Sequence, residues 1–188
     1  MSYYDKKENV KEYIKMAEGF DGRKLIKILK THLRKGSTVL ELGIGPGKDL
    51  DLLKNDFIVT GSDNSYLFIN SYKEKNPDAD LIFLDATKMN TPQKFNCIYS
   101  NKVLQHLTRE EFKISLNKQK EVLNKNGILF HSLWYGDTVE TYNDLRFTYY
   151  TENSLKQIIG ESFEILEMNL YTEMEVDDSL YIVLKKKD

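Results

Sequence analysis

The chain has 188 residues, of which 27 are basic and 29 acidic, and its formal net charge is −2. This length is typical of one domain. Without a basic surplus, no nucleic-acid partner is expected, because affinity for phosphate backbones comes largely from lysine and arginine. The single cysteine, Cys97, excludes a disulfide framework, a multi-cysteine zinc site and an iron–sulfur cluster. It suits a reducing compartment, and no apolar run is long enough for a membrane helix, so we expect a cytoplasmic chain without a membrane partner.

The first part of the chain has the hydrophobic periodicity of helices. Apolar residues recur at helical spacing from Val10 to Phe20. A second helix carries its apolar residues between Leu25 and Leu33, with Asp21 as its N-cap. We expect residues 1–36 to form an N-terminal helical cap on a core formed by residues 37–188, the two together making a single domain, 1–188.

Strands and helices then alternate. Buried strands are predicted at residues 38–42, 57–61, 80–84, 95–100 and 128–134, with helices at 47–54, 65–75 and 110–124. A helix at 151–160 precedes two strands, 163–171 and 179–185, whose short link favours antiparallel pairing. Apolar strands that alternate with helices are typical of a parallel sheet covered on both faces. The sequence therefore predicts the α/β class, with a doubly wound, mostly parallel seven-stranded sheet, an antiparallel C-terminal edge strand and N-terminal helices.

Three alternating glycines follow the first predicted strand. They stand in the segment VLELGIGPGK at positions 43, 45 and 47. Glycine allows a sharp turn and the close approach of a ligand, and open α/β sheets bind ligands at this end of their strands. A Walker loop is excluded because Asp49 replaces the magnesium-binding hydroxyl, and a dinucleotide loop is excluded because Lys48 replaces the third glycine. Glu41 and Asp49 suit a ligand with a cationic part.

Two further carboxylates follow the next two predicted strands. Asp63 comes directly after the second strand, where a side chain in an open crevice can accept hydrogen bonds from both hydroxyls of a ribose. Asp85 comes directly after the third strand, further along the same crevice and within reach of an adenine amino group. Together with the glycines, these acids predict a nucleoside site at the carboxyl ends of the strands.

With these residues the chain resembles a known family, the class I (Rossmann-like, seven-stranded) S-adenosylmethionine-dependent methyltransferases, of the small-molecule type. The resemblance covers nearly all of the chain. The motifs that carry it are LELGIGPG, GSDNS and LDA after the first three predicted strands, FNCIYSNKVLQHL at the fourth and LNKNGILFHSLW at the fifth. Asn126 replaces the first glycine of the family's pattern before the fifth strand.

The resemblance implies S-adenosylmethionine as cofactor and S-adenosylhomocysteine as product. The backbone at the three glycines would pack on the methionine part, with Glu41 beneath it. Asp63 would hold the ribose, Asp85 the adenine edge, and Ser100 would supply a carbonyl for the cofactor's amino group, while Tyr13 would close over the methionine end. The implied cofactor-binding residues are Tyr13, Glu41, Gly43, Gly45, Gly47, Asp63, Asn64, Asp85, Ala86 and Ser100.

The class of methyl acceptor can be narrowed by excluding other kinds of methyltransferase. Amino-methylating enzymes for adenine or glutamine usually carry a Pro-Pro pattern after the fourth strand, where residues 100–103 read SNKV. Cys97 lies inside a predicted strand and is expected to be a core residue rather than a nucleophile. A small-molecule acceptor remains, and His106 is the candidate catalytic base because its pKa suits proton transfer near neutrality. His131 is expected to be structural and His32 to be solvated.

Aromatic residues follow the fifth predicted strand, where insertions in this fold meet the substrate. An aromatic wall with one arginine suggests a flat or carboxylate-bearing acceptor. The expected acceptor-pocket residues are Trp134, Tyr135, Arg146, Phe147, Tyr149 and Tyr150.

Two alternatives stay open at this stage. One is a protein that binds S-adenosylmethionine without transferring its methyl group, and the other is a tRNA or protein methyltransferase, which the charge balance favours less. No metal site is expected, and the chain is expected to be a monomer or a homodimer. Transfer of labelled methyl groups to metabolites separates the enzyme from a protein that only binds the cofactor.

Overall fold

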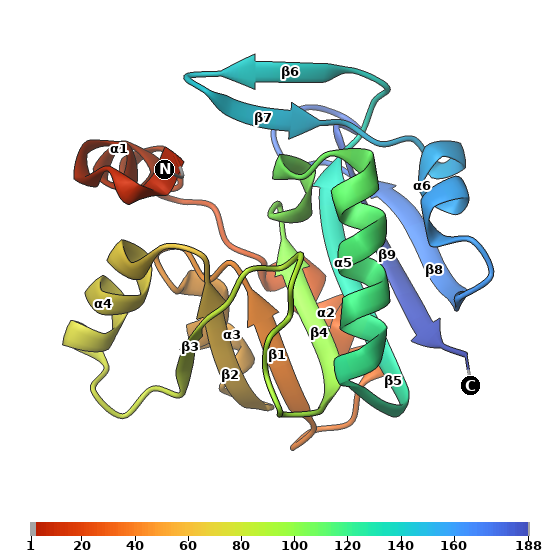
Figure 1. The fold of residues 1–188 in the computed structure, drawn as a ribbon, viewed down its shortest axis with the longest axis horizontal. Coiled ribbons are helices and arrows are strands. Elements are labelled where there is room, and N and C mark those ends of the chain that lie inside the picture. Colours follow the sequence, from red (N-terminus) through yellow and green to blue (C-terminus); the bar gives the residue numbers. More distant parts are fainter. Residues whose placement is uncertain (1–2, 188) are drawn as a thin grey trace.

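A computed structural model describes residues 3–187. Its centre is a seven-stranded sheet with the strand order β3-β2-β1-β4-β5-β9-β8 (Figure 1). The pairs β2–β3, β1–β2, β1–β4 and β4–β5 are parallel, whereas β9 pairs antiparallel with both β5 and β8. The strands are β1 Thr38–Leu42, β2 Ile58–Asp63, β3 Leu81–Phe83, β4 Phe95–Asn101, β5 Leu123–Trp134, β8 Phe163–Tyr171 and β9 Ser179–Lys186.

Helices cover both faces of this sheet (Figure 1). One apolar core lies between the sheet and α5 and α6, and a second core lies between the sheet and α2, α3 and α4. Successive residues of β1 serve different cores, since Val39 packs in one and Leu40 in the other, and both are fully buried. The helices are α1 Lys7–Met16, α2 Arg23–His32, α3 Lys48–Leu53, α4 Tyr66–Lys75, α5 Arg109–Val122 and α6 Glu152–Ile159, with short 3-10 turns η1 Tyr3–Asp5 and η2 Leu104–His106.

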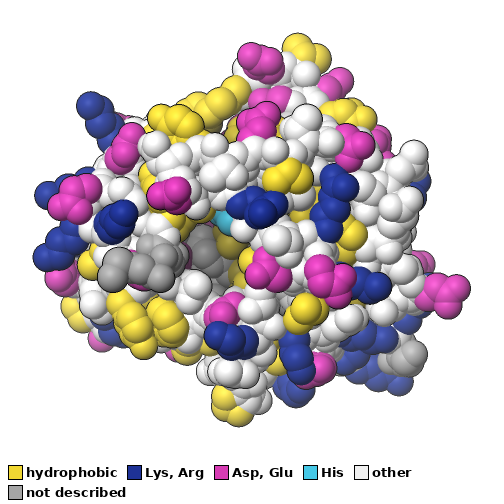
Figure 2. All heavy atoms as spheres, turned by 45° about the horizontal axis from the view of Figure 1, so that its top comes forward, with side chains coloured by type: hydrophobic (Ala, Val, Ile, Leu, Met, Phe, Trp, Pro, Cys, Tyr) yellow, Lys and Arg dark blue, Asp and Glu magenta, His cyan; other side chains and the backbone are white. Residues whose placement is uncertain are grey.

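Two elements lie beyond the carboxyl ends of the central strands. The arrowheads of β1 and β4 point toward the end of the sheet where α1 lies together with a hairpin formed by β6 Val139–Tyr142 and β7 Leu145–Thr148 (Figure 1). Figure 2 turns this end toward the viewer and shows acidic and basic side chains interspersed over it. The central strands therefore end beneath a layer built from two distant parts of the sequence.

The predicted fold class is confirmed. The strand–helix alternation and the antiparallel C-terminal edge are as expected, and residues 163–171 form β8 as predicted. The predicted domain, 1–188, includes residues 1, 2 and 188, which lie outside the described residues. Within the described residues, no helix is both long and apolar enough to cross a membrane.

Several boundaries differ from the expectation. The first helix ends at Met16, so Phe20 lies outside it, and Gly22 rather than Asp21 is the N-cap of α2. The Asp21 carboxylate still accepts a hydrogen bond from the Arg23 N–H at 3.0 Å. In addition, β5 begins at Leu123 because the chain leaves α5 directly in extended conformation and pairs with Phe95.

The β6–β7 hairpin was not predicted as secondary structure. Its two-residue loop is Asn143-Asp144, between the paired residues Tyr142 and Leu145. Both loop residues have positive φ, 49° and 65°, which is the requirement of the tight turns that suit hairpins, and asparagine and aspartate tolerate it well. The sequence signal for this hairpin was the Asn-Asp pair, which stands between two segments of alternating hydrophobicity.

Phe112 of α5 tests how far the apolar core holds the fold together. Its ring is fully buried against Tyr150, with ring centroids 5.4 Å apart. Phe112→Ala is expected to lower the free energy of unfolding by about 3–5 kcal/mol, because it leaves a cavity in a close-packed core. Ile114→Ala on the same helix, at a side chain that is 42% exposed, is the matched control and should change it by less than about 0.5 kcal/mol. Urea unfolding measures both, and equal losses would contradict the assignment of the core.

Candidate active site

The loop between β1 and α3 is fixed to the end of β2. The N–H groups of Gly43 and Ile44 both donate to the carbonyl of Ser62, at 2.7 and 2.9 Å. The N–H of Gly45 donates to Oδ2 of Asp63 at 3.0 Å. Three consecutive backbone donors therefore hold this loop against the neighbouring strand.

The three glycines of the loop have different roles. All have left-handed φ values, 71° at Gly43, 49° at Gly45 and 86° at Gly47. A Cβ on Gly43 would lie 2.6 Å from Val103, and a Cβ on Gly47 would overlap the ring of Tyr72. A Cβ on Gly45 would meet only Tyr13, at 3.4 Å. Gly43 and Gly47 are thus required by the packing of the protein itself, whereas Gly45 faces open space.

Glu41 is a buried acid without a full set of partners. It is 3% exposed, and its Oε2 atom has no hydrogen-bond partner. Burial raises the pKa of Glu41 well above its usual range, and the nearby carboxylates of Asp49 and Asp63 raise it further. A buried polar atom without a partner is costly and marks a place where a ligand group can bind.

Asp63 lies at the carboxyl end of β2 and is less open than expected. It is 8% exposed, and Oδ1 accepts a hydrogen bond from the N–H of Ser65 at 2.9 Å. Burial raises the pKa of Asp63 to about 6, although the backbone donors of Gly45 and Ser65 oppose the rise. The carboxylate is therefore held in a fixed orientation and titrates just below neutrality.

Asp85 follows β3 and is engaged by its own turn. Oδ1 accepts hydrogen bonds from the backbone N–H and the hydroxyl of Thr87, at 2.8 and 2.7 Å. Lys88 forms an ion pair with Oδ2 at 3.0 Å. Asp85 is thus positioned at the mouth of the crevice by a local network.

Two adjoining cavities lie at these strand ends. The first, which we call the loop cavity, has a volume of about 270 Å³ and is lined by the predicted residues Tyr13, Gly43, Gly45, Asp63, Asn64, Asp85 and Ala86. The second, the cap cavity, has a volume of about 220 Å³ and lies between the N-terminal segment, Glu41 and the hairpin. Tyr4, Tyr13, Gly43, Lys102 and His106 line both, so the two cavities meet at these residues.

Two predicted cofactor residues line neither of these cavities. Gly47 is covered by the ring of Tyr72. Ser100 is fully buried inside the sheet, with its hydroxyl 2.9 Å from Nδ1 of His131. The next two residues of the chain, Asn101 and Lys102, reach the cap cavity instead. The backbone roles expected for Gly47 and Ser100 stay predictions.

The N-terminal segment is tied to the core by polar contacts. The Ser65 hydroxyl donates to the Tyr4 carbonyl at 2.8 Å, and Nζ of Lys48 donates to the Ala17 carbonyl at 2.7 Å. Tyr13 lies edge-on to Tyr4, with ring centroids 5.4 Å apart. Burial raises the pKa of Tyr13 to about 12, so its hydroxyl stays protonated.

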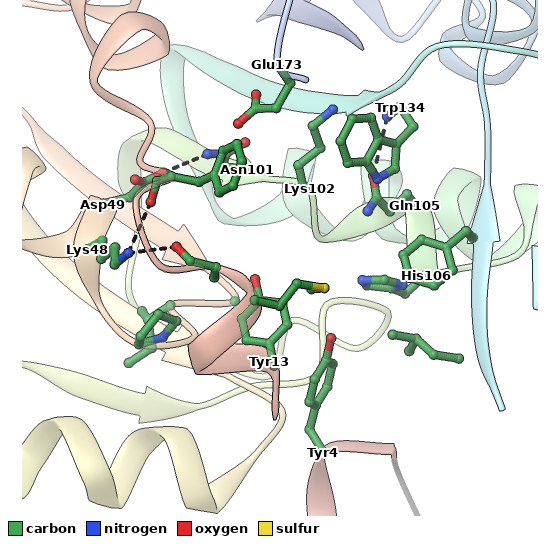
Figure 3. Close-up of a pocket in the computed structure, with 18 of the residues that line it drawn as sticks. Tyr4, Tyr13, Lys48, Asp49, Asn101, Lys102, Gln105, His106, Trp134 and Glu173 are labelled. Carbon is green, nitrogen blue, oxygen red and sulfur yellow. Dashed lines mark hydrogen bonds between the residues drawn. The ribbon is translucent and has the colours of Figure 1, made fainter. Parts of the chain in front are cut away.

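Asp49 completes this attachment, a role the sequence did not reveal. Its carboxylate accepts hydrogen bonds from the Gly22 N–H at 2.6 Å, the Tyr99 hydroxyl at 2.8 Å and the Asn101 amide at 3.0 Å (Figure 3). These donors come from the start of α2 and from β4. Asp49 therefore joins the cap to the centre of the sheet.

His106 has a defined tautomer. Its Nδ1 lies 2.7 Å from the Arg146 carbonyl in β7. Because a carbonyl can only accept, Nδ1 carries the hydrogen and Nε2 keeps a free lone pair. Burial lowers the pKa of His106, and the bond to Arg146 opposes this. The ring is therefore neutral at physiological pH and can accept a proton at Nε2.

Lys102 is a site residue that sequence reasoning missed. It directly follows β4 with φ of 59°, a strained conformation for lysine. Its Nζ atom lies 3.4 Å from the centre of the Trp134 ring (Figure 3). It also donates to Ser179 Oγ at 2.6 Å. Burial lowers the pKa of Lys102 to about 7, against the opposing charges of Glu173 and Asp178. The only available signal was its position after the fourth strand.

The expected acceptor wall is only partly present. Trp134 and Phe147 line the cap cavity. Tyr150 is fully buried in the core, and Tyr149 packs beside Gly136. The Arg146 side chain is exposed, and neither it nor Tyr149 nor Tyr150 lines either cavity. The expectation of an arginine in the acceptor pocket is therefore corrected.

The remaining histidines and Cys97 are structural. His131 and Cys97 are fully buried, as expected. His32 is not solvated as expected, because its Nε2 lies within hydrogen-bond distance, 2.7 Å, of the Glu167 carboxylate in β8.

Gly45 and Gly47 offer a test of these roles. Gly47→Ala is expected to lower the free energy of unfolding by at least about 2 kcal/mol more than Gly45→Ala, because both place Cβ in a left-handed backbone but only the first also displaces Tyr72. Thermal and urea unfolding of the two variants provide the measurement. If Gly45→Ala were the more damaging change, the assignment of Gly45 to open space would be wrong.

Comparison with known proteins agrees with this geometry. Residues 39–127 match the family model described as a methyltransferase domain. A search of curated proteins gave no match. Among solved structures, an S-adenosylmethionine-dependent methyltransferase from Clostridium acetobutylicum ATCC 824 aligns with a TM-score of 0.77 at 12% identity, over 95% of this chain and 99% of that one.

Two further structures contain bound molecules. The 1,6-didemethyltoxoflavin-N1-methyltransferase of Burkholderia thailandensis, solved with 1,6-didemethyltoxoflavin and S-adenosylhomocysteine, aligns with a TM-score of 0.76 at 17% identity, over 88% of this chain and 78% of that one. The N-methyltransferase NodS of Bradyrhizobium japonicum WM9, in complex with S-adenosylhomocysteine, aligns with a TM-score of 0.68 at 14% identity, over 88% and 85%.

At such identities the structural likeness establishes the fold. The match to the methyltransferase domain covers the segment from β1 to the start of β5. This segment contains the glycine loop, Asp63, Asp85 and His106. The matched segment and the seven-stranded sheet agree: residues 39–127 carry a methyltransferase domain, and the chain has the fold of class I, Rossmann-like S-adenosylmethionine-dependent methyltransferases.

Proposed function

We propose that the chain transfers a methyl group from S-adenosylmethionine to a small-molecule acceptor. The observation that carries this proposal is the pair of adjoining cavities, one lined by the glycine loop and the two strand-end acids and the other containing His106. The adenosine part of the cofactor would lie in the loop cavity. Its methyl group would then face the acceptor in the cap cavity.

The residues of the loop cavity fit this cofactor. Gly45 leaves its space open, and Asp63 offers a carboxylate with lone pairs remaining for two ribose hydroxyls. Asp85 and Ala86 lie further along the same cavity, where they would bind the edge of the adenine ring. The unpartnered Oε2 of Glu41 lies on the methionine side and suits a cationic group, either directly or through water. When bound, the cofactor supplies an electrophilic methyl group on a sulfonium.

The chemistry left to the protein is alignment and proton transfer. Tyr4, Tyr13 and His106 line both cavities and would fix the acceptor next to the methyl group. Holding two reactants in line contributes about 7–11 kcal/mol to lowering the barrier in well-oriented systems. Nε2 of His106 can accept a proton from an acceptor that must lose one.

Size and charge favour a small acceptor. The cap cavity has a volume of about 220 Å³ and is covered by side chains of the N-terminal segment and the hairpin, such as Met16 and Phe147. Charges of both signs are interspersed over this face (Figure 2), which gives no broad basic surface for RNA. A protein of similar fold binds the small molecule 1,6-didemethyltoxoflavin, which also supports a small acceptor.

Labelling separates this proposal from its alternatives. The chain is incubated with methyl-labelled S-adenosylmethionine and a cell extract, and the label is followed by mass spectrometry. Label in a small molecule supports the proposal. Label in RNA or protein supports a macromolecular methyltransferase, and cofactor binding without any labelled product supports a protein that only binds the cofactor. The cytoplasmic location stays a prediction, and so does the monomeric or homodimeric state.

The titration of Asp63 gives a pH dependence to cofactor binding. Since the pKa of Asp63 is about 6, lowering the pH from 7.5 to 5.5 protonates about three quarters of it. The ionised form is the better acceptor for ribose hydroxyls, so affinity for S-adenosylhomocysteine should be roughly four-fold lower at pH 5.5 and should level off above pH 7. Calorimetric titration at both pH values measures this.

Matched variants identify the group responsible. Asp63→Asn should weaken binding at pH 7.5 by about 1.5–3 kcal/mol, the value of hydrogen bonds to a charged group, and remove most of the pH dependence. Asp78→Asn, at an exposed carboxylate outside both cavities, should bind as the wild type does. Wild-type affinity in Asp63→Asn would remove Asp63 from the site.

His106 is tested by rate. With the acceptor found by labelling, His106→Ala should slow methyl transfer by roughly 10²–10⁴-fold, the usual contribution of general base catalysis, with cofactor affinity nearly unchanged. The loss should shrink at high pH, where the acceptor ionises unaided. His32→Ala, at a contact with Glu167 of β8 outside both cavities, is the control and should keep the wild-type rate. An unchanged rate in His106→Ala from pH 6 to 9 would leave alignment alone as the catalytic contribution.

A further inference from the structure

The cap cavity is acidic. Carboxylates from four separate parts of the chain line it: Glu12, Asp21, Glu41, Asp49 and Glu173. Among its described lining residues the cations are Lys48 and Lys102, and there is no arginine. In Figure 3 Glu173 and Tyr4 lie on opposite sides of the cavity, so acidic groups are not confined to the cofactor side.

The two lysines already have partners within the protein. Nζ of Lys48 donates to the carbonyls of Ala17 and Phe20, at 2.7 and 3.4 Å. Nζ of Lys102 donates to the Leu133 carbonyl at 3.1 Å as well as to Ser179, and it lies over the Trp134 ring. An acidic group on a ligand could form an ion pair with either lysine only if these contacts were broken.

Several of the acids keep capacity for a cation. Oε2 of Glu41, which is buried and unpartnered, is taken by the cationic group of the cofactor in the proposed function. Within the described residues, neither Glu12 nor Glu173 has an ion-pair partner within 4.0 Å, whereas Asp21 pairs with Arg23 at 3.1 Å. Burying these carboxylates beneath a ligand would be costly unless the ligand brought positive charge.

The rest of the lining is apolar and aromatic. Met16, Phe20 and Tyr142 line the cavity although they are 62%, 41% and 67% exposed. Trp134 and Phe147 add two aromatic rings, although Nζ of Lys102 already lies over one face of Trp134. Aromatic rings attract an ammonium ion, and exposed apolar side chains at a cavity mouth gain free energy by covering an apolar ligand.

We propose that the acceptor is a primary or secondary amine carried on an apolar, ring-sized body and bound as its ammonium ion. This inference rests on the proposed function, because it names the substrate class of the same site. It replaces the carboxylate-bearing acceptor that the sequence suggested, since Arg146 lies outside the cavity.

The proposed reaction balances with the groups present. The bound ammonium ion transfers one proton to Nε2 of His106, whose Nδ1–H is held by the Arg146 carbonyl. The freed lone pair on nitrogen forms a bond to the methyl carbon while the carbon–sulfur bond breaks and its electron pair stays on sulfur. The products are the N-methylated ammonium ion and S-adenosylhomocysteine, and His106 returns its proton to solvent.

Three matched probes test this inference by calorimetry on the chain saturated with S-adenosylhomocysteine. Phenethylamine, 2-phenylethanol and 3-phenylpropanoate share an apolar body and differ in charge. Phenethylamine should bind at least about ten-fold more tightly than the alcohol, equal to about 1.4 kcal/mol, and the acid should bind most weakly. Glu173→Gln should weaken binding of the amine by about 3–10-fold and leave the alcohol unchanged.

Glu161→Gln, at an exposed acid that does not line the cavity, is the control and should bind all three probes as the wild type does. Preference for the acid, equal affinity for the three probes, or no binding of the amine at millimolar concentration would overturn the inference. Failure of S-adenosylhomocysteine itself to bind would instead overturn the proposed function, so the two failures are distinguishable.

Discussion

The attachment of the β1–α3 loop to the end of β2 is the constraint on which the site depends. Three consecutive N–H groups, from Gly43, Ile44 and Gly45, donate to the carbonyl of Ser62 and the carboxylate of Asp63. This holds the glycine backbone in left-handed conformations that most residues disfavour. It also fixes the orientation of Asp63, because the same carboxylate accepts from Ser65. The shape of the loop cavity is therefore fixed by contacts within the protein itself.

The cap cavity depends on contacts between distant segments. Asp49, just after the loop, accepts from Gly22 and so places the N-terminal segment over the strand ends. On the other side, the carbonyl of Arg146 in β7 fixes the tautomer of His106. The cap and the hairpin thus enclose the proposed acceptor space and also set which nitrogen of His106, the proposed base, is free. In the proposed function the same arrangement would link substrate selection to proton transfer.

Much of the cofactor side could be predicted from the sequence. Strand and helix periods, the glycine loop and the acids at successive strand ends all follow local rules, and Gly45, Asp63 and Asp85 do line the loop cavity. The contacts of Gly47 with Tyr72 and of Ser100 with His131 are tertiary contacts, which no local pattern records. The acceptor side was harder. Whether Tyr150 enters the core or the cavity, and where the chain of Lys102 points, depends on how the hairpin and β9 pack, which no local pattern records.

The central claim is that the loop cavity is built for S-adenosylmethionine rather than for another nucleotide. Calorimetric titration of the wild-type chain with S-adenosylhomocysteine, and in parallel with NAD and ATP, tests it most directly. We expect one bound S-adenosylhomocysteine per chain, with no comparable binding of NAD or ATP, because Glu41 and Asp63 disfavour phosphates beside the loop. Clear binding of NAD or ATP, with no heat from S-adenosylhomocysteine, would contradict it.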